Sequence, residues 1–235
     1  MAALVSFALP LGLKEYSEQA DLREIQAFVA APEPEKSGAS AIAEYNKLIA
    51  EAGIATRDPW SEPAESLTKT DLALLALVRE LSDSPHLTAA LLIPAIDLKI
   101  PVYYGTSEAV LSRGSGVVEG TFVPTGAVGE HSLIAAHRGT YYHRTFHDLG
   151  EVQMGDQFVL INAEKMLSYE VVLIRVVPPY ELNAIQINED LNLVTLVTCD
   201  PIPTYINRLL VTGKLISSKP LPPGSTLEDL LASGG

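Results

Sequence analysis

The sequence predicts a mostly β protein, a closed or nearly closed barrel of about eight strands that follows a helical extension. From residue 89 on, short β-rich runs are separated by Gly, Pro and Asp, which is typical of a barrel rather than of a parallel sheet covered by helices. The expected strands lie at residues 91–95, 99–102, 117–119, 132–136, 157–161, 166–177, 191–198 and 208–215. Short helical insertions are expected at 108–113 and 142–149.

Both faces of the run at 191–198 are apolar, which is a second indication of a barrel. Leu191 and Leu193 point to one side, whereas Val194 and Leu196 point to the other. A strand that is apolar on both sides is typical of a central strand covered on both faces. We therefore place this run in the middle of the sheet.

The first 88 residues have helical periodicity. Apolar residues recur at spacings of three and four around Leu22–Val29 and again from Ile42 to Ile49, and a third such stripe covers about 71–81. We predict three parts: an N-terminal helical extension at 1–88, a β-barrel domain at 89–217 and a C-terminal spacer at 218–235. The apolar run at 2–13 is too short to span a bilayer, so it is either the remnant of a membrane anchor or the start of a helix.

The charge balance excludes some classes of partner. The 235 residues carry 16 Lys and Arg against 29 Asp and Glu, a net charge of -13. Binding to nucleic acid phosphates or to anionic lipid requires a basic surface. We therefore expect no nucleic acid partner.

The single cysteine, Cys199, lies where a β-rich run ends. Pro201 cannot continue the hydrogen bonding of a central strand, so the thiol is expected at a strand end that faces a surface groove. A lone cysteine is commonly a small buried hydrophobic residue, and this context leaves the inert and the reactive interpretation equally open.

Two other residues could assist a thiol. Arg208 opens the next apolar run, so it could face Cys199 across the sheet, although a surface Arg at a strand end explains it as well. His137 closes the run at 132–136, again at a strand end. A histidine or arginine near a thiol supplies the positive potential that favours a thiolate. His143 and His147 are four residues apart, but no third ligand completes a metal site with them.

These segments together resemble the sortase family. Residues 195–199 (TLVTC) resemble the sortase cysteine motif, residues 135–139 (AAHRG) the histidine motif, and Arg208 stands where the family has its arginine. Residues 100–108, 118–121 and 146–156 are similar to the pilus-assembling class C sortases. The resemblance covers about residues 90–216 in the family's order.

The resemblance implies an eight-stranded sortase barrel and a cysteine transpeptidase. Such enzymes cut an LPxTG-like sorting signal between Thr and Gly, with Cys199 as nucleophile, His137 as proton-transfer partner and Arg208 as oxyanion stabiliser. In class C the acceptor is the side-chain amine of a pilin lysine. We expect Thr198 and Asp200, the neighbours of the nucleophile, to contact the substrate, and we expect no metal or organic cofactor.

Asp58-Pro59-Trp60, within a loop at about 56–64, resembles the lid motif of class C. The resemblance implies that the carboxylate faces Arg208 and that the indole covers Cys199. A surface Asp-Pro turn is the alternative from the residues alone. Asp200 departs from the usual class C run after the cysteine, and its charge should oppose thiolate formation unless it is paired.

Two further functions stay open beside pilus assembly. One is a housekeeping-type sortase that anchors surface proteins to peptidoglycan, and the other is an inactive peptide-binding barrel. The implied partners are pilins or surface proteins with LPxTG-like signals. The implied location is the outer face of the cell membrane of a Gram-positive bacterium, where the full-length protein would be membrane-anchored, and we expect a monomer.

Overall fold

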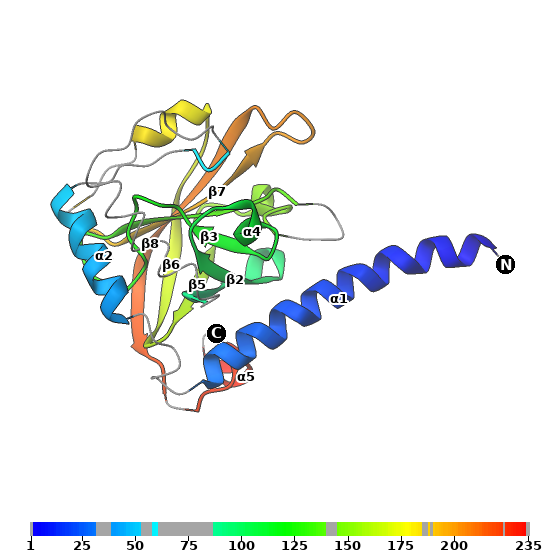
Figure 1. Ribbon diagram of the computed structural model, residues 1–235, viewed down its shortest axis with the longest axis horizontal. Coiled ribbons are helices and arrows are strands. Elements are labelled where there is room, and N and C mark those ends of the chain that lie inside the picture. The colour runs from blue at the N-terminus through cyan, green and yellow to red at the C-terminus, as the bar shows by residue number, and fades with distance from the viewer. Residues whose placement is uncertain are drawn as a thin grey trace.

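The computed structural model confirms the mostly β architecture with an eight-stranded closed barrel (Figure 1). It describes residues 2–31, 39–52, 58–60, 87–139, 145–184, 188, 190–222 and 224–233. The helix expected at 71–81, together with His86 and His143, lies outside these described residues. Within them, the β part of the chain begins at Ala89.

The barrel closes in the order β1-β2-β3-β4-β7-β8-β6-β5. Its strands are β1 (Ala89–Ile93), β2 (Leu98–Tyr104), β3 (Ser115–Val117), β4 (His131–Ala136), β5 (Gln157–Asn162), β6 (Lys165–Val177), β7 (Leu193–Asp200) and β8 (Asn207–Pro220). The β2–β3 and β4–β7 pairs are parallel, and the other pairs are antiparallel. The β4–β7 pair brings together segments about 60 residues apart in the sequence, which matters for the site.

Helices of different lengths accompany the barrel, from a long N-terminal helix to short 3-10 turns. They are α1 (Ala2–Ala30), α2 (Ala39–Ala52), α4 (Glu108–Leu111), α5 (Leu227–Ser233) and the 3-10 turns η2 (Pro94–Ile96), η3 (Leu149–Glu151) and η4 (Pro179–Ala184). The helix α4 is the insertion expected at 108–113. The insertion expected at 142–149 is described only from residue 145, where the chain turns before entering η3.

Alternating side chains fill the interior of the barrel. In β7 the inward residues are Val194 and Leu196, and both are fully buried in the main apolar cluster. The helix α2 covers one side of this core, because Tyr45 and Ile49 are fully buried in the same cluster. The Tyr45 hydroxyl accepts a hydrogen bond of 2.9 Å from the backbone N–H of Gly120. The expected stripe of the second helix is therefore part of the barrel core.

The helix α1 extends away from the barrel at its N-terminal end and packs at its C-terminal end (Figure 1). Ile25 and Val29 are buried against the outer side of β1, in a cluster that also contains Leu227 and Leu230 of α5. The prediction of a spacer after residue 217 is therefore corrected. The strand β8 continues to Pro220, and the apolar pair Leu227 and Leu230, one helical turn apart, docks α5 onto α1.

Some predicted strand ends also differ from the structure. The first strand ends at Ile93 because Pro94 begins η2. The third strand covers Ser115–Val117 rather than 117–119, because Glu119 and Gly120 form a turn. The Glu119 carboxylate accepts hydrogen bonds from the backbone N–H and the hydroxyl of Thr106, which fixes this turn. A turn stabilised by contacts distant in sequence has no local signal.

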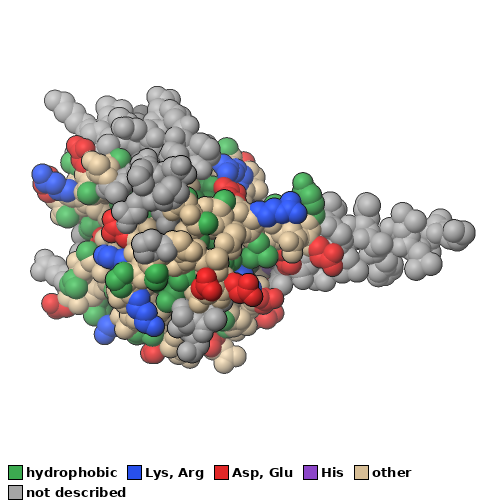
Figure 2. Space-filling model, turned by 90° about the horizontal axis from the view of Figure 1, so that it is seen from below, with side chains coloured by type: hydrophobic (Ala, Val, Ile, Leu, Met, Phe, Trp, Pro, Cys, Tyr) green, Lys and Arg blue, Asp and Glu red, His purple; other side chains and the backbone are tan. Residues whose placement is uncertain are grey.

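Lys and Arg side chains are interspersed with Asp and Glu on the face of the molecule in Figure 2. This mixture fits the acidic overall balance of 16 Lys and Arg against 29 Asp and Glu. Across the described residues, no helix is both long enough and apolar enough to cross a membrane.

We predict that truncating Tyr45 destabilises the whole barrel. Replacing Tyr45 with Ala removes a buried ring and leaves the N–H of Gly120 without its partner, so it should cost about 3–5 kcal/mol of unfolding free energy, measured by urea denaturation. Lys47→Ala, on the exposed side of the same helix, should change it by less than about 0.5 kcal/mol. Equal effects of the two variants would show that α2 is not part of the cooperative unit.

Candidate active site

The site lies beside an apolar patch on the outer face of the sheet. We call it the outer patch: it is formed by buried side chains of β4, β6, β7, β8 and the segment after β3, namely Val118, Leu133, Ala135, Val177, Val197 and Leu210. These positions alternate with those that fill the barrel interior. The ring of Trp60 packs against the outer patch.

Each of the three candidate residues lies two positions along the chain from a residue of the outer patch. His137 follows Ala135 by two positions, Cys199 follows Val197 by two, and Arg208 precedes Leu210 by two. Since side chains repeat with a period of two along a strand, the three are expected on the same outer face as the patch. This is the edge where β4 and β7 end and β8 begins.

Strand pairing sets their spacing. In the antiparallel β7–β8 pair, Cys199 lies directly opposite Arg208. In the parallel β4–β7 pair the ladder ends with Ala135 opposite Val197. The side chain of Arg138 contacts Asp200 at 3.1 Å, so the segments that continue β4 and β7 stay neighbours beyond the last paired residues. His137 and Cys199, one residue earlier in each chain, therefore occupy adjacent positions.

The backbone around these residues is fixed by hydrogen bonds from distant segments. The carbonyl of His137 accepts hydrogen bonds from the backbone N–H of Phe146 and from the hydroxyl of Thr145. The hydroxyl of Thr198 donates to the carbonyl of Ala136 at 2.9 Å and ties β7 to β4. The two strand ends are thus held together at the point where the candidate side chains emerge.

The described segment 58–60 lies at this end of the barrel, as the short cyan trace in Figure 1 shows. The Asp58 carboxylate accepts two hydrogen bonds from Arg208, from Nε at 2.6 Å and from Nη2 at 2.7 Å. Both side chains of this pair are less than one tenth exposed. The remaining nitrogen of Arg208, Nη1, donates to the carbonyls of Tyr205 and Asn207. Every nitrogen of the guanidinium therefore has a partner within the chain.

The indole of Trp60 contacts both Arg208 and His137. The guanidinium carbon of Arg208 lies 4.8 Å from its ring centroid, and its Nε1 lies 3.4 Å from Nδ1 of His137. An indole N–H can only donate, so Nδ1 of His137 must accept and is unprotonated in this arrangement. The imidazole proton then lies on Nε2, which is 3.2 Å from the carboxylate of Glu108. The sequence did not indicate this role for Glu108, which lies at the start of α4.

The thiol of Cys199 is half-buried among charged groups of both signs. Burial raises its pKa, Arg208 lowers it, Asp58 raises it and Arg138 lowers it, and the net result is a pKa above the usual value. Burial also disfavours the charged form of Arg208, but the hydrogen bonds to Asp58 and the nearby thiol keep the pKa of Arg208 above its usual value. In the described conformation the thiol is therefore held in its neutral form.

Thr198 and Asp200, which the sequence led us to expect in contact with a substrate, do not share the face of Cys199. Both alternate to the side of β7 that Val194 and Leu196 share, away from the face of Cys199. Thr198 is fully buried, and Asp200 is paired with Arg138. The pairing removes most of the repulsion that the sequence predicted between Asp200 and a thiolate.

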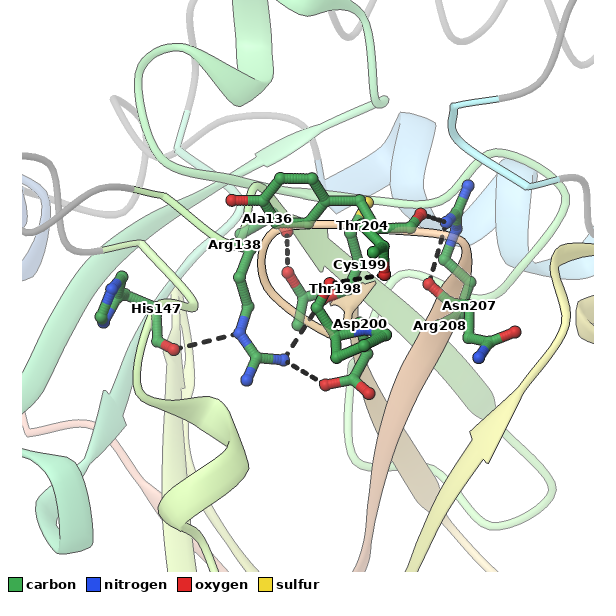
Figure 3. A network of polar contacts seen from close by, with 11 residues as sticks. Ala136, Arg138, His147, Thr198, Cys199, Asp200, Thr204, Asn207 and Arg208 are labelled. Atoms are coloured by element: carbon green, nitrogen blue, oxygen red, sulfur yellow. Dashed lines mark hydrogen bonds and ion pairs between the residues drawn. The ribbon is translucent and has the colours of Figure 1, made fainter.

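The sequence analysis assigned no role to Arg138. Its side chain is 12% exposed and donates three hydrogen bonds, to the carbonyl of His147 and to the carbonyl of Cys199 and the carboxylate of Asp200 (Figure 3). The sequence did contain a hint of this ion pair. Arg138 follows His137 and Asp200 follows Cys199, so two β-rich runs end with opposite charges at equivalent positions. Only the parallel pairing of β4 with β7 makes these positions neighbours.

The other described histidines have structural contacts. His131 is buried and its Nε2 lies 2.9 Å from the hydroxyl of Thr195, on the same face of the sheet as the outer patch. The Nδ1 of His147 lies 2.6 Å from the carboxylate of Asp148. In the described part of the chain, no three His, Cys, Asp or Glu side chains are placed to hold a metal ion.

The chain is a closed barrel with a cysteine, a histidine and an arginine at the shared end of β4, β7 and β8. This is the arrangement that the sequence resemblance implied for a sortase. The family model described as the sortase domain matches residues 91–216. The match covers more than half of the chain and includes all three candidate residues. This protein is a member of the sortase family.

The chain is similar to several characterised sortases. It is 35% identical to sortase C2 of Pilus Island 1 from group B Streptococcus, with a TM-score of 0.63 over 76% of this chain and 97% of that chain. It is 28% identical to sortase A from Corynebacterium diphtheriae, with a TM-score of 0.68 over 87% of this chain and 94% of that one. It is 27% identical to sortase D of Bacillus subtilis over 53% of this chain and 62% of the relative, less than two thirds of that protein's length.

We predict that removing the charge of Asp58 makes the thiol easier to ionise. Asp58→Asn removes an anion that raises the pKa of Cys199 and frees the charge of Arg208, so the pH midpoint of iodoacetamide labelling should fall. Labelling at pH 7 should rise by about threefold or more. Cys199 is the only cysteine, so the signal has one source.

Glu164→Gln is the matched control, because it removes the same charge from the β5–β6 turn at the other end of the barrel. Its labelling midpoint should stay at that of the unmodified protein. A midpoint for Asp58→Asn that equals this control would show that the carboxylate does not influence the thiol.

Proposed function

We propose that this protein is a cysteine transpeptidase that cleaves an LPxTG-like sorting signal and joins the acyl group to a lysine amine of a pilin subunit. The observation that carries this proposal is the meeting of Cys199, His137 and Arg208 at one edge of the sheet. Membership of the sortase family supports it, as does the likeness to sortase C2 of Pilus Island 1. The proposed site of action is the outer surface of a Gram-positive cell.

In the first proposed step, the thiol of Cys199 passes its proton to the imidazole of His137, and its sulfur attacks the carbonyl carbon between Thr and Gly of the signal. The negative charge that develops on the carbonyl oxygen is stabilised by the donors of Arg208, which lies opposite the cysteine in the strand pair. The C–N bond then breaks, and the leaving amine takes a proton from His137. The products are a thioacyl enzyme and the released C-terminal peptide.

In the second step, the lysine amine attacks the thioacyl carbon. The amine gives one proton to the imidazole of His137, the C–S bond breaks and Cys199 is restored. The product is an isopeptide bond between two subunits. The outer patch next to the thiol offers an apolar surface for the leucine and proline of the signal.

We further propose that Asp58, Pro59 and Trp60 form a lid that keeps this site inactive. Arg208 cannot stabilise an oxyanion while Asp58 occupies two of its nitrogens, and His137 cannot take a proton at Nδ1 while the indole donates to it. Trp60 also packs on the outer patch where the signal would bind. Release of this segment would free all three elements together.

The contacts of Asp58 and Trp60 favour pilus assembly over the alternative, a housekeeping sortase that anchors surface proteins to peptidoglycan. A lid that pairs with the arginine of the site is the feature by which the sequence resembles class C. The likeness to sortase A from C. diphtheriae keeps the alternative in view. The remote alternative is an inactive barrel that only binds peptides.

We predict that Cys199→Ala abolishes covalent capture of the signal. The Trp60→Ala variant, in which the proposed lid contact is removed, should gain the mass of the acyl fragment when incubated with an LPxTG peptide, and the wild-type protein should gain it more slowly because the lid must first leave the site. Cys199→Ala should gain none, because an alanine side chain has no nucleophile. Intact-protein mass spectrometry provides the measurement, and absence of the adduct from both active proteins would favour the inactive barrel.

We predict that Arg208→Lys loses most activity although the charge is kept. A lysine is a point charge and cannot reproduce two parallel donors at the spacing seen with Asp58, so the rate of thioacyl formation should fall by about 100-fold. Arg175→Lys, on the exposed part of β6, is the control and should keep its rate. Normal turnover of Arg208→Lys would reassign this residue to a structural role.

The two sortase functions are separated by the acceptor. Trp60→Ala is incubated with a pilin that carries its sorting signal, and in parallel with a short amine from peptidoglycan. Lysine-linked ladders on a denaturing gel support pilus assembly. Efficient use of the short amine without ladders supports the housekeeping function and overturns the proposal.

A further inference from the structure

A second guanidinium, that of Arg138, lies beneath the candidate nucleophile. Its Nη1 donates both to the backbone carbonyl of Cys199 at 3.2 Å and to the carboxylate of Asp200 at 3.1 Å, and its Nε donates to the carbonyl of His147 at 3.1 Å. Figure 3 shows the side chain reaching from the end of β4 across to the end of β7. One side chain thus joins three segments at the point where the thiol is presented.

The packing around Arg138 leaves little room for another arrangement. Its side chain is only 12% exposed, and a Cβ atom added to Gly150 would lie 3.0 Å from its Nη2. The glycine therefore makes space for the guanidinium. An arginine held by three acceptors in a close-fitting site has one defined position, unlike a surface arginine.

The pair lies on the other side of the strands from the catalytic face. Asp200 shares a side of β7 with Thr198, whereas Cys199 shares the opposite side with Val197. A substrate bound over the outer patch would therefore meet Cys199 but not the Arg138–Asp200 pair. Arg138 can act on the reaction only through the position and the charge environment of the cysteine.

We propose that Arg138 is a positioning residue for Cys199, which fixes the cysteine backbone at the end of β7 and neutralises the adjacent carboxylate of Asp200. The proposal rests on the function proposed above, because it gives the residue a role in presenting the nucleophile. It assigns to Arg138 a task different from that of Arg208, which faces the substrate side. The two guanidinium groups thus act from opposite faces of the same strand end.

The charges around the thiol make the proposal testable. The charges that act on the thiol of Cys199 are those of Arg208 from β8, Asp58 from the segment 58–60 and Arg138 after β4. Asp200, on the other side of β7, is the partner of Arg138, and His137 occupies the position adjacent to Cys199. Removing Arg138 leaves the anion of Asp200 unbalanced, which disfavours a thiolate. Removing the charge of Asp200 leaves the cation of Arg138 unbalanced, which favours one. The two changes should therefore shift the titration in opposite directions.

The experiment titrates the single thiol of the full chain by its rate of reaction with iodoacetamide across pH, in Arg138→Met, Asp200→Asn and the double variant. We expect the midpoint to rise in Arg138→Met, to fall in Asp200→Asn and to return close to that of wild type when both charges are removed. Lys214→Met is the control, because it removes the same charge from the part of β8 that pairs with Leu193, at the far end of β7. Its midpoint should not move.

A merely structural role would overturn the proposal. In that case Arg138→Met and Asp200→Asn would lower the unfolding free energy, but their midpoints would both stay unchanged or would move in the same direction. If Arg138→Met does not fold, Asp200→Asn decides alone: a lower midpoint supports the proposal, and an unchanged or higher one refutes it. The titration needs no sorting substrate, so a failed thioacyl capture with opposite shifts refutes the transpeptidase but not the role of Arg138.

Discussion

The pairing of β7 with β8 is the constraint on which the site depends. It sets Cys199 opposite Arg208, and a slip of one residue would turn one of them toward the barrel interior. The register is held along the strand by inward residues such as Val194 and Leu196, whose burial would be lost by such a slip. The same apolar interior that stabilises the barrel therefore fixes the geometry of the polar residues at its end.

Charge around the thiol is balanced in two pairs, one on each face of the strand end. Asp58 neutralises Arg208 on the outer face, and Asp200 neutralises Arg138 on the other. The difference between the pairs lies in their connection to the chain. Arg138 and Asp200 follow β4 and β7 directly and are held by the sheet, whereas Asp58 belongs to a segment 150 residues from its partner in sequence. The outer pair therefore joins the sheet to a segment that is not one of its strands, whereas the other pair joins two neighbouring strand ends.

Features of the fold and the site could be predicted where a short stretch of sequence carries the pattern, and could not where they depend on contacts between distant segments. The barrel and the three candidate residues were found because strands end abruptly at His137 and Cys199, and because their motifs are similar to those of a family. The roles of Arg138 and Glu108 were missed because each depends on a contact between segments far apart in the sequence, 62 residues in the case of Arg138 and Asp200. Thr198 was expected to contact the substrate because it neighbours Cys199, but adjacent residues of a strand place their side chains on opposite faces, and that of Thr198 is buried. The tail was predicted as a spacer because a helix of seven residues gives too short a periodic pattern.

The contacts of Asp58 with Arg208 also explain why the thiol of Cys199 is neutral in this structure. Burial and Asp58 both raise the pKa of Cys199, and Arg208 opposes them only in part while its donors are occupied. Moving the carboxylate of Asp58 away removes an anion that raises the pKa of Cys199. It also leaves the cation of Arg208 unpaired opposite the sulfur, so both changes lower the pKa of the thiol. The indole of Trp60 leaves Nδ1 of His137 in the same movement. Under the proposed function, the nucleophile, the proton acceptor and the oxyanion site would then become available in one step, at the moment when the substrate gains access.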